Sequence, residues 1–358
     1  MEAFVIRPQK GKIISHPARW WSLEEDGKIR CELCPRLCRI GEGQAGFCTI
    51  RQNHGGKLVS LGYGRPTGFG VDPIEKKPLF HFYPGTQILS FGTVGCNLGC
   101  QFCQNWDMSK AKTENHRAIE VTPEKVVGLA LQELCPGIAY TYNDPVIFGE
   151  FVVDVSKCAH EKNIKNVMVT AGYIEPKARE EVFHYIDAAN VDLKSFSEEF
   201  YFKLTLSHLK PVLDTLEWLH RETEVWIEIT TLLIPGRNDS DDEIRREAEW
   251  ILKHVGDAVP LHLTAFHPAY RMTDIPRTPA DTLLRARALA RKAGLKFVYV
   301  GNILDTEGST TYCPSCQEVL IERNWHTISE FRLIEDRCPA CGLKVPGRFD
   351  AAGIPRKG

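Results

Sequence analysis

Short apolar runs alternate with amphipathic stretches through the middle of this chain. The runs are rich in β-branched and aromatic residues and lie at residues 88–94, 138–142, 166–171, 191–195, 226–234, 261–266 and 297–301. The stretches between them carry apolar residues at helical spacing, as at 145–163, 240–256 and 279–294. Strand–helix repetition of this kind predicts parallel strands with right-handed crossovers, and so either a doubly wound sheet or an α/β barrel.

Residues typical of helix starts stand at the beginnings of these stretches. Asp144, Ser240 and Thr278 each offer an N-cap, and the first and third precede a Pro suited to the first helical turn. Residues 60–87 are rich in Gly and Pro, which predicts an ordered loop leading into the first strand.

The overall composition is that of an ordinary globular chain. Its 358 residues are 43% hydrophobic and 25% charged, which excludes extensive disorder. The 44 Lys and Arg against 46 Asp and Glu leave no overall field that would gather nucleic acid or an anionic membrane. No apolar run would span a membrane, and residues 1–12 lack the apolar core of a secretory leader. We therefore expect a cytoplasmic protein without membrane contact.

Cysteine is the residue type that changes this picture. In a reducing cytoplasm, clustered thiols bind metal more often than they form disulfides. Two of the 13 cysteines, Cys135 and Cys158, stand alone, and we interpret them as small buried hydrophobes. The others form three groups: Cys31, Cys34, Cys38 and Cys48; Cys96, Cys100 and Cys103; and Cys313, Cys316, Cys338 and Cys341.

The central group has the spacing Cys96-x3-Cys100-x2-Cys103 and directly follows a predicted strand. Three thiolates on one short loop can hold three irons of a 4Fe–4S cluster and leave the fourth iron open to a small molecule. The alternative is a zinc site with a distant fourth ligand, but zinc sites usually show paired Cys-x2-Cys units. Phe102 adds a flat apolar surface, and glycines on the loop allow the backbone to wrap closely around a cluster.

This loop resembles the signature of the radical S-adenosylmethionine (SAM) superfamily, and the resemblance extends over about residues 85–302. It implies a partial (β/α)6 TIM-like barrel in which SAM binds the open iron of the cluster. An electron from the cluster would cleave SAM, and the resulting 5′-deoxyadenosyl radical would abstract hydrogen from a substrate. The cofactor would supply the difficult chemistry while the protein directs it and excludes water and oxygen.

The resemblance also implies a site at the C-terminal ends of the strands. The residues expected to bind the cofactor are Phe102, Thr141, Asn143, Thr170, Asp192, Lys194, His267 and Asn302. Asp192 and Lys194 resemble the Asp-x-Lys motif of glycyl-radical activating enzymes, whose Lys pairs with the SAM carboxylate; a barrel ion pair without ligand is the alternative. Thr141 and Asn143 stand where the superfamily commonly has Gly-Gly-Glu-Pro, and Thr230 stands where those activases have a basic residue. His267 is the candidate catalytic residue, as a proton-transfer group or ribose contact.

The N-terminal cysteines could close either a structural zinc site or a second iron–sulfur cluster, because their x2, x3 and x9 spacing is not that of an ordinary zinc ribbon. The N-terminal half resembles more closely the radical SAM member of the AmmeMemoRadiSam system, which implies partners of the Memo and AMMECR families. The matching residues are Cys-x2-Cys-Pro-Arg-x-Cys, Asp72-Pro-Ile-Glu-Lys-Lys-Pro78 before His81-Phe82, Gly95-Cys-Asn-Leu and Cys103-Gln-Asn-Trp106. Lys76, Lys77 and His81 are candidates for lining the substrate mouth; a solvated loop with a capping His is the alternative.

The C-terminal cysteines form two Cys-x2-Cys knuckles separated by 21 residues, which predicts a zinc ribbon, with a rubredoxin-like iron centre as the alternative. Trp325, Ile328, Phe331 and Leu333 suit a small hairpin scaffold. Residues 305–358 carry 7 Lys and Arg against 8 Asp and Glu, so protein contact or stability is favoured over nucleic-acid binding.

We thus expect three parts: an N-terminal cysteine module with its connecting loop (1–84), a radical SAM partial barrel (85–304) and a C-terminal zinc-ribbon-like module (305–358). The activase-like motifs favour an oxygen-sensitive enzyme that abstracts hydrogen from a protein, as in glycyl-radical activation. Radical modification of a small molecule or an RNA nucleotide, with the ribbon as docking element, is the alternative. A metal-cluster scaffold without catalysis is a third. A reducing partner such as ferredoxin or flavodoxin is implied.

Overall fold

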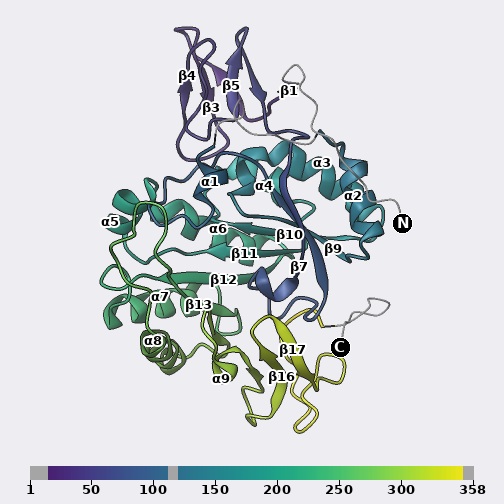
Figure 1. Ribbon diagram of the computed structural model, residues 1–358, viewed down its shortest axis with the longest axis vertical. Helices are drawn as coiled ribbons and strands as arrows, with labels where there is room; N and C mark the ends of the chain where they lie inside the picture. Colours follow the sequence, from purple (N-terminus) through teal and green to yellow (C-terminus); the bar gives the residue numbers. More distant parts are fainter. Residues whose placement is uncertain (1–14, 112–119, 350–358) are drawn as a thin grey trace. The chain divides into compact units, whose positions relative to one another are not determined.

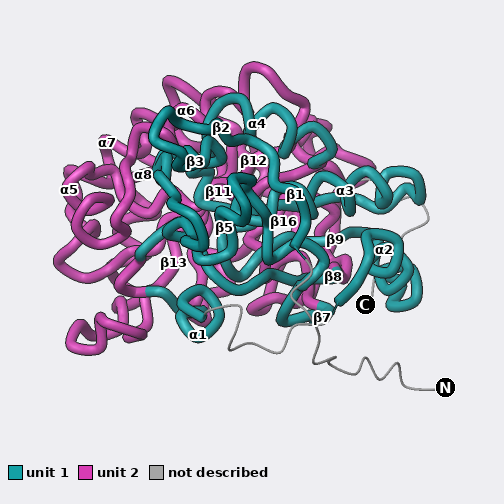
Figure 2. The backbone as a smooth tube through the Cα atoms, turned by 90° about the horizontal axis from the view of Figure 1, so that it is seen from above, with its two compact units in different colours: residues 1–71, 89–99, 103–186 teal, residues 72–88, 100–102, 187–358 magenta. Residues whose placement is uncertain are grey.

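The computed structural model describes residues 15–111 and 120–349. The first residues, on which the expectation of no secretory leader depends, lie outside this range. The fold is mixed α/β, and its central sheet has eight strands, β7 to β14 (Figure 1). The chain divides into two compact units, which Figure 2 distinguishes by colour: residues 1–71, 89–99 and 103–186, and residues 72–88, 100–102 and 187–358. No helix in the described ranges is long and apolar enough to cross a membrane.

The first unit begins with two small antiparallel sheets. One sheet has the order β1–β6–β5, formed by His16–Pro17, Lys57–Ser60 and Arg51–His54. The other has the order β2–β3–β4, formed by Trp21–Leu23, Ile29–Cys31 and Arg39–Ile40. The strands are short, but residues such as Ile29, Ile40 and Leu58 are fully buried between them and their neighbours. The N-terminal cysteines lie at the strand ends and loops of these sheets.

Parallel strands and crossover helices make up the rest of the first unit. The strands are β8 (Gln87–Gly92), β9 (Gly137–Tyr140) and β10 (Lys165–Thr170), with Ser90 opposite Ala139 and Val167 opposite the same residue. The helices are α1 (Trp106–Ser109), α2 (Pro123–Gln132), the 3-10 helix η3 (Pro145–Phe148), α3 (Gly149–His160) and α4 (Pro176–Phe183). Every residue of β9 is buried, as expected for a parallel strand covered on both faces.

One strand of the first unit lies where the sequence predicts a loop. β7 spans Thr67–Pro73, so the expectation for residues 60–87 is wrong at these positions. Glycines concealed the strand, because they weaken β propensity and often mark a close approach of another group. A Cβ at Gly68 would lie 3.4 Å from the ring of Tyr142, and one at Gly70 would lie 3.5 Å from its hydroxyl. These are ordinary contact distances, so the strand packs against Tyr142 without crowding, and the φ of +69° at Gly68 is what favours glycine there.

The second unit repeats the strand–helix pattern. Its parallel strands are β11 (Ala188–Asp192), β12 (Trp226–Leu233), β13 (Leu261–Ala265) and β14 (Val298–Gly301), paired in chain order. Its helices are the 3-10 helix η1 (Ile74–Lys76), α5 (Glu198–Phe200), the π-helix η4 (Tyr201–Thr205), α6 (Leu209–Glu222), α7 (Asp241–His254), α8 (Ala280–Ala293) and α9 (Thr306–Ser309). All seven strands predicted from the apolar runs are present.

Two of the three predicted helix caps are confirmed. The side chain of Ser240 accepts a hydrogen bond from Glu243 N at the start of α7, and that of Asp144 accepts from Val146 N at the start of η3. The expectation for Thr278 is wrong, because Pro279 occupies the N-cap position of α8. The Thr278 hydroxyl instead donates to Leu233 O, at the end of β12.

The C-terminal part is a three-stranded antiparallel sheet, β15 (Thr311–Tyr312), β16 (Val319–Asn324) and β17 (Thr327–Phe331). The predicted hairpin is confirmed, with Ile328, Phe331 and Leu333 packed at its core. Trp325 is not part of that core; it lies at the turn and is 45% exposed. The same apolar cluster includes Phe80, Phe297 and Tyr299, so this sheet shares its core with the strands of the second unit.

Candidate functional site

The cysteine loop follows β8 and is held by polar contacts at three of its residues after Cys96. Within the first unit these contacts are Asn97 Nδ2 to Tyr173 O (2.9 Å), Lys110 Nζ to Leu98 O (2.8 Å) and Cys103 Sγ to Ser109 Oγ (3.2 Å). Burial and the carboxylate of Asp144 raise the pKa of Cys96. The Cys96 thiol is therefore protonated, and a metal would have to displace its proton on binding, since thiolates are the ligands of iron–sulfur clusters.

The end of β9 shapes the loop. Asn143 accepts a hydrogen bond from Thr93 N through Oδ1 (3.1 Å) and donates through Nδ2 to Thr93 Oγ1 (3.0 Å) and Gly95 O (2.8 Å). A Cβ at Gly92 would lie 2.5 Å from Thr141 O and 2.6 Å from Asn143 Oδ1, so only glycine fits there. Asn143 is therefore a positioning residue for the loop. The SAM contacts expected of Thr141 and Asn143 stay predictions.

Asp144 links the ends of β9 and β10. Its Oδ1 accepts from the hydroxyl of Thr170 (2.8 Å) and its Oδ2 accepts from Ala171 N (3.2 Å). Thr170 also accepts from Gly172 N (3.0 Å) and is 1% exposed. Thr141, Asn143 and Thr170 are thus brought together at one end of the strands, although the hydroxyl of Thr170 is already used. Sequence reasoning treated Asp144 only as a cap, although its Asp-Pro position between two strand-end motifs was a usable signal.

The second unit places Lys194 beside Asp192 and Cys100. Lys194 Nζ donates to Asp192 Oδ2 at 2.8 Å, and its backbone N donates to Tyr201 Oη at 3.0 Å. Lys194 lies beyond the end of β11, not within it as predicted. The reason is that its backbone N–H bonds to the Tyr201 hydroxyl instead of to a neighbouring strand. Burial alone would lower the pKa of Lys194, but the charges of Asp192 and Cys100 outweigh it and raise this pKa. The ammonium group is therefore charged and close to a cysteine of the loop.

Thr230 adds a free polar group next to this ion pair. It is opposite Asp192 in the register of β11 and β12, so the two side chains point to the same face of the strands. Its hydroxyl is buried and has no hydrogen-bond partner among the described residues. A buried polar group without a partner costs free energy, which a bound ligand can recover. The sequence indicated this position only as a departure from the activase pattern.

The remaining predicted residues differ in their surroundings. Phe102 is buried and its ring centroid lies 5.7 Å from that of Phe200. His267 is exposed just beyond the end of β13. Asn302 is exposed, and its Nδ2 donates to Ala265 O at 3.1 Å. The cofactor roles of all three, and the catalytic role of His267, stay predictions.

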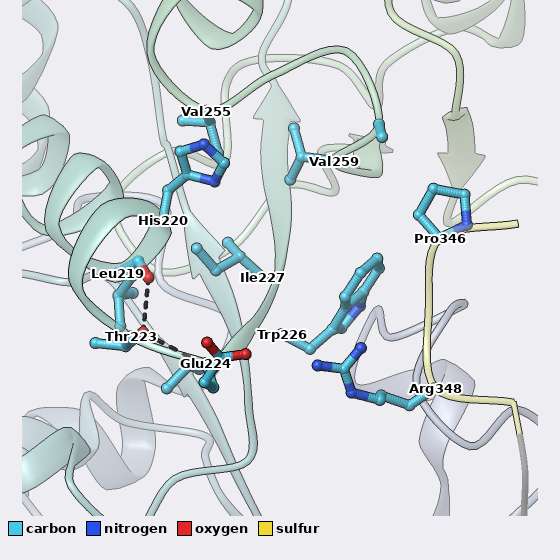
Figure 3. Close-up of a pocket in the computed structure, with 12 residues that line it drawn as sticks. Leu219, His220, Thr223, Glu224, Trp226, Ile227, Val255, Val259, Pro346 and Arg348 are labelled. Carbon is cyan, nitrogen blue, oxygen red and sulfur yellow. Dashed lines mark hydrogen bonds between the residues drawn. The ribbon is translucent and has the colours of Figure 1, made fainter.

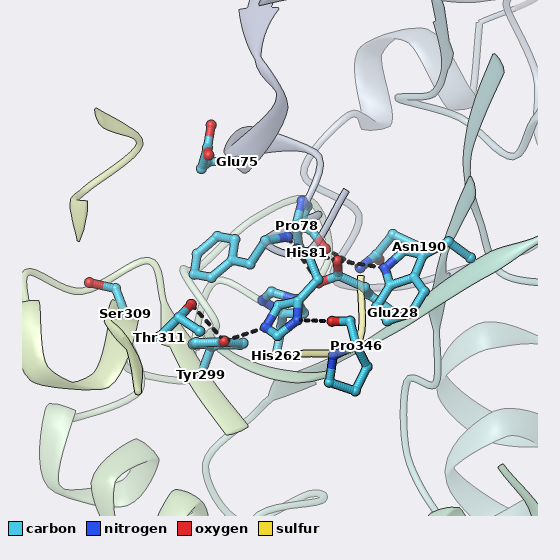
Figure 4. A network of polar contacts seen from close by, with 12 residues as sticks. Glu75, Pro78, His81, Asn190, Glu228, His262, Tyr299, Ser309, Thr311 and Pro346 are labelled. Atoms are coloured by element: carbon cyan, nitrogen blue, oxygen red, sulfur yellow. Dashed lines mark hydrogen bonds and ion pairs between the residues drawn. The ribbon is translucent and has the colours of Figure 1, made fainter. Parts of the chain in front are cut away.

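The segment after β7 takes a position other than the expected substrate mouth (Figure 4). His81 is fully buried, with Nε2 2.6 Å from Tyr299 Oη and Nδ1 2.7 Å from Pro346 O. Glu228 accepts hydrogen bonds from Phe80 N (2.9 Å), His81 N (2.7 Å) and His262 Nε2 (2.7 Å). His81 therefore lines neither a substrate mouth nor a solvated loop, because β12, β13 and β14 enclose it. Of the two lysines, Lys77 is buried with its Nζ 2.6 Å from Asp72 Oδ2, and the side chain of Lys76 is half exposed.

A hollow of about 260 Å³ opens at the start of β12, as Figure 3 shows. Leu219 and His220 of α6 line it, together with Trp226, Ile227 and Arg348. None of the residues predicted to bind the cofactor lines this hollow. Because Thr230 lies nearer to the C-terminal end of the same strand, the hollow is separate from the candidate site.

The C-terminal cysteines form a compact four-thiol site. The ligand atoms of Cys313, Cys316, Cys338 and Cys341 all lie within 4.8 Å of one another. The sulfurs of Cys313 and Cys341 are 3.6 Å apart, as are those of Cys316 and Cys338. Four sulfurs at about 2.3 Å from one ion, at the corners of a tetrahedron, would be about 3.8 Å apart. This site therefore has the dimensions for a single metal ion.

Comparison with known proteins shows which family these features belong to. Over 330 residues the chain is 42% identical to an uncharacterized protein of Methanocaldococcus jannaschii, a match that covers 92% of this chain and 98% of that protein. Residues 91–248 match the radical SAM superfamily. The chain belongs to the radical SAM superfamily. This radical SAM protein is therefore an enzyme, and its central cysteine group is the one that carries the superfamily signature.

One more distant sequence match agrees with this assignment, and one solved structure shares the fold. A pyruvate formate-lyase-activating enzyme of Clostridium pasteurianum is 25% identical over 194 residues, 51% of this chain and 76% of that enzyme. A solved radical SAM methyltransferase from Sphaerobacter thermophilus has a TM-score of 0.50 at 15% identity, covering 85% of this chain and 81% of that one. The structural match shows a shared fold.

The superfamily implies a 4Fe–4S cluster and SAM, and the residues present fit them. Cys96, Cys100 and Cys103 supply three thiols on one short loop, and the loop's close packing depends on glycine. Lys194 supplies a positive charge for a carboxylate, and Thr230 a buried hydroxyl with no partner in the part of the chain that the structure describes. Both groups belong to the second unit, as does Cys100.

Proposed function

We propose that this protein cleaves SAM reductively and abstracts hydrogen from a protein substrate, in the manner of a glycyl-radical activating enzyme. Cys96, Cys100 and Cys103 would hold the 4Fe–4S cluster, which supplies one electron to SAM when it is bound. The chain's own residues bind and orient SAM, and keep water away from the reacting atoms.

The arrangement of Lys194, Asp192 and Cys100 carries this proposal. Lys194 is 16% exposed at its side chain and keeps its charge next to a thiol of the cysteine loop. A fixed ammonium group beside the cluster is suited to receive the carboxylate of SAM. Asp192 holds the ammonium at 2.8 Å, so it limits the directions from which a carboxylate can approach.

A protein substrate is favoured by the similarity to activating enzymes. The match to the pyruvate formate-lyase-activating enzyme covers half of this chain, and the Asp192-x-Lys194 motif is the part of the site that both share by resemblance. Such a substrate would be a large glycyl-radical enzyme. The C-terminal four-cysteine sheet, which we propose binds zinc, would then serve stability or partner contact.

The alternative substrate is a small molecule or an RNA nucleotide. The near balance of charge in residues 305–358 disfavours RNA, because phosphate binding requires a clear excess of Lys and Arg. Membership of the AmmeMemoRadiSam group, with partners of the Memo and AMMECR families, remains part of the proposal. So do an electron donor such as ferredoxin or flavodoxin, a cytoplasmic location and sensitivity to oxygen.

Formation of 5′-deoxyadenosine tests the proposed chemistry. Anaerobically reconstituted full-length protein with dithionite and SAM is expected to form it, and Cys100→Ala is expected not to. Cys158→Ala is the matched control, since Cys158 lies on α3 and belongs to none of the three cysteine groups. Slow turnover without substrate agrees with the proposal, whereas complete absence of product from iron-loaded wild-type protein contradicts it.

The substrate class needs a separate experiment. Full-length protein is mixed with a purified glycyl-radical enzyme encoded in the same genome, and the glycyl radical is measured by EPR. A radical signal that depends on SAM and on Cys100 supports a protein substrate. Binding to structured RNA with a steep loss of affinity as salt rises would instead favour the nucleotide alternative.

A further inference from the structure

The N-terminal cysteines form a buried group in the first unit. Cys31 ends β3, and its N–H donates to Cys38 O at 2.9 Å, which brings two of the ligand positions together. Cys31, Cys34 and Cys48 are each less than a tenth exposed. Phe47 N, next to Cys48, donates to Cys38 Sγ at 3.5 Å, and Leu37 N, next to Cys38, donates to Cys34 O at 3.0 Å, so the segments that carry the four cysteines lie close together.

The group is more open than the C-terminal one. Within residues 15–111 and 120–349, the C-terminal cysteines are the one set of three or more Cys, His, Asp or Glu whose ligand atoms gather within 4.8 Å. The N-terminal sulfurs are therefore spread more widely than four ligands around one ion. In a 4Fe–4S cluster each cysteine binds a different iron, so its four sulfurs are necessarily farther apart than in a zinc site.

The N-terminal group is in direct contact with the catalytic cysteine loop through two backbone positions of the first unit. A Cβ at Gly95, whose φ is +85°, would lie 2.1 Å from Cys48 O. The backbone carbonyl of Cys48, in the N-terminal group, therefore touches Gly95, the residue before Cys96 of the catalytic loop. Arg36, which lies between Cys34 and Cys38, donates through Nε to Asn97 O on the loop.

A buried ion pair anchors this arrangement to helix α3 of the same unit. Arg51 and Glu150 are almost completely buried, and Arg51 Nη1 lies 2.8 Å from Glu150 Oε1 on α3. Arg51 follows Cys48 by three residues, so this ion pair holds the backbone segment that carries Cys48 against α3.

We infer that Cys31, Cys34, Cys38 and Cys48 hold a second 4Fe–4S cluster, in contact with the catalytic loop through Cys48 and Gly95. The metal assignment stands on its own residues, whereas a role in SAM cleavage rests on the proposed function. Exchange between the two clusters would move one electron, oxidising one and reducing the other, with no bond made or broken. The electron would come from a one-electron protein donor of the ferredoxin or flavodoxin class.

Iron and sulfide content of full-length protein tests the site. The variant Cys96→Ser/Cys100→Ser/Cys103→Ser removes the catalytic ligands and leaves the N-terminal group intact. After anaerobic reconstitution we expect about eight irons per chain in the wild type and about four irons with about four sulfides in this variant. The variant Cys34→Ser/Cys48→Ser is expected to keep only the catalytic cluster, and Cys158→Ser is the matched control with the wild-type content.

The outcomes separate this inference from the proposed function. A triple variant that binds zinc and no iron would overturn the second cluster, whatever the protein does with SAM. A triple variant with four irons, in a protein that forms no 5′-deoxyadenosine, would support the cluster and contradict the function. If Cys34→Ser/Cys48→Ser fails to fold, the triple variant still decides the metal.

EPR of the reduced protein tests the contact between the two groups. Two reduced clusters this close are expected to broaden or split each other's signals, so the wild-type spectrum should differ from the sum of the two variant spectra. A wild-type spectrum equal to that sum would overturn the contact. Because no substrate or turnover is needed, a merely structural role for the N-terminal group would not produce the broadening.

Discussion

Close approach of the backbone explains why two positions beside the cysteine loop are glycine. At Gly92 the space for a side chain is taken by Thr141 O and Asn143 Oδ1, and at Gly95 it is taken by Cys48 O. The sequence suggested that these glycines make room for a cluster. The structure shows that at these two positions they make room for the chain itself.

Replacement of Gly95 by Ala should cost more than backbone strain alone. Gly43 is the matched control, because its φ is +70° and a Cβ there would meet nothing within 4 Å. We expect Gly43→Ala to lower the free energy of unfolding by about 1 kcal/mol and Gly95→Ala by about 3 kcal/mol. Anaerobic urea unfolding of the full chain measures both. Equal losses would show that Gly95 and Cys48 are not in contact.

Lys194 is the single side chain on which SAM binding should depend most. Lys194→Met removes the ammonium, and loss of a charged hydrogen bond worth about 1.5–3 kcal/mol predicts at least about a tenfold rise in the KM for SAM. Iron content should be unchanged. Lys203→Met is the control, since Lys203 is 65% exposed and pairs with Glu199 one turn away. The measurement is the rate of 5′-deoxyadenosine formation against SAM concentration, and an unchanged KM would refute the role.

Among the elements, the segment 72–83 is the one whose position in the structure differs most from the position expected from the sequence. The motif DPIEKKPLFHF indicated a functional surface, yet its backbone and His81 are bonded to Glu228 and Tyr299 in the interior. A distinctive sequence can arise from a demanding interior network as readily as from a substrate site, because every buried polar group needs a partner. No local pattern distinguishes the two cases.

This buried segment should make stability depend on pH. Burial lowers the pKa of His81 to about 4, against 6.5 in an unfolded chain. Between pH ~6.5 and pH 4, His81 binds a proton in the unfolded chain but not in the folded one. The free energy of unfolding is therefore steady above pH ~6.5 and falls as the pH decreases toward 4. We expect His81 to contribute a loss of about 2 kcal/mol between pH 7 and pH 5.

Urea unfolding of His81→Gln at the two pH values measures this contribution. The variant cannot titrate, so its stability should change less over this range than that of the wild type. His208→Gln, at an exposed position, is the control and should behave as the wild type does. If His81→Gln and the wild type lose equal stability on acidification, another group is responsible.

Hydrophobic periodicity predicted some of the other elements correctly and missed others. The apolar runs predicted the strands β8 to β14 because a strand covered on both faces must be continuously apolar. β7 was missed because its glycines remove that signal. Lys194 was placed inside a strand, although a hydroxyl from Tyr201, seven residues away, ends the pairing. A hydrogen bond from the backbone to a side chain several residues away leaves no recognisable pattern in the local sequence.

At the scale of the whole molecule, the C-terminal sheet is part of the second unit and shares a core with its strands. Cys313 and Cys338 are buried in the apolar cluster that also contains Phe80, Phe297 and Tyr299. A metal bound by these cysteines would act as a ligand that stabilises the folded state more strongly the higher its affinity, so its loss should disturb more than the sheet itself.

Cys316→Ser tests this coupling with little damage to packing, because Cys316 is exposed. We expect the variant to lose one metal ion per chain and more than about 3 kcal/mol of unfolding free energy. Elemental analysis and urea unfolding give the two values, and Cys158→Ser is the control. A variant that keeps its metal, or loses it with no change in stability, would contradict a structural metal at this site.

The sequence by itself determined the chemistry of the cysteine loop and the class of fold. Three thiols within eight residues are close together in any fold, and strand–helix periodicity is a local property. Only the tertiary structure decided that the C-terminal thiols lie within 4.8 Å of one another, that His81 is interior, that Lys194 lies near Cys100 and that Cys48 touches Gly95. Each of these depends on residues far apart in the chain, which packing alone brings into contact.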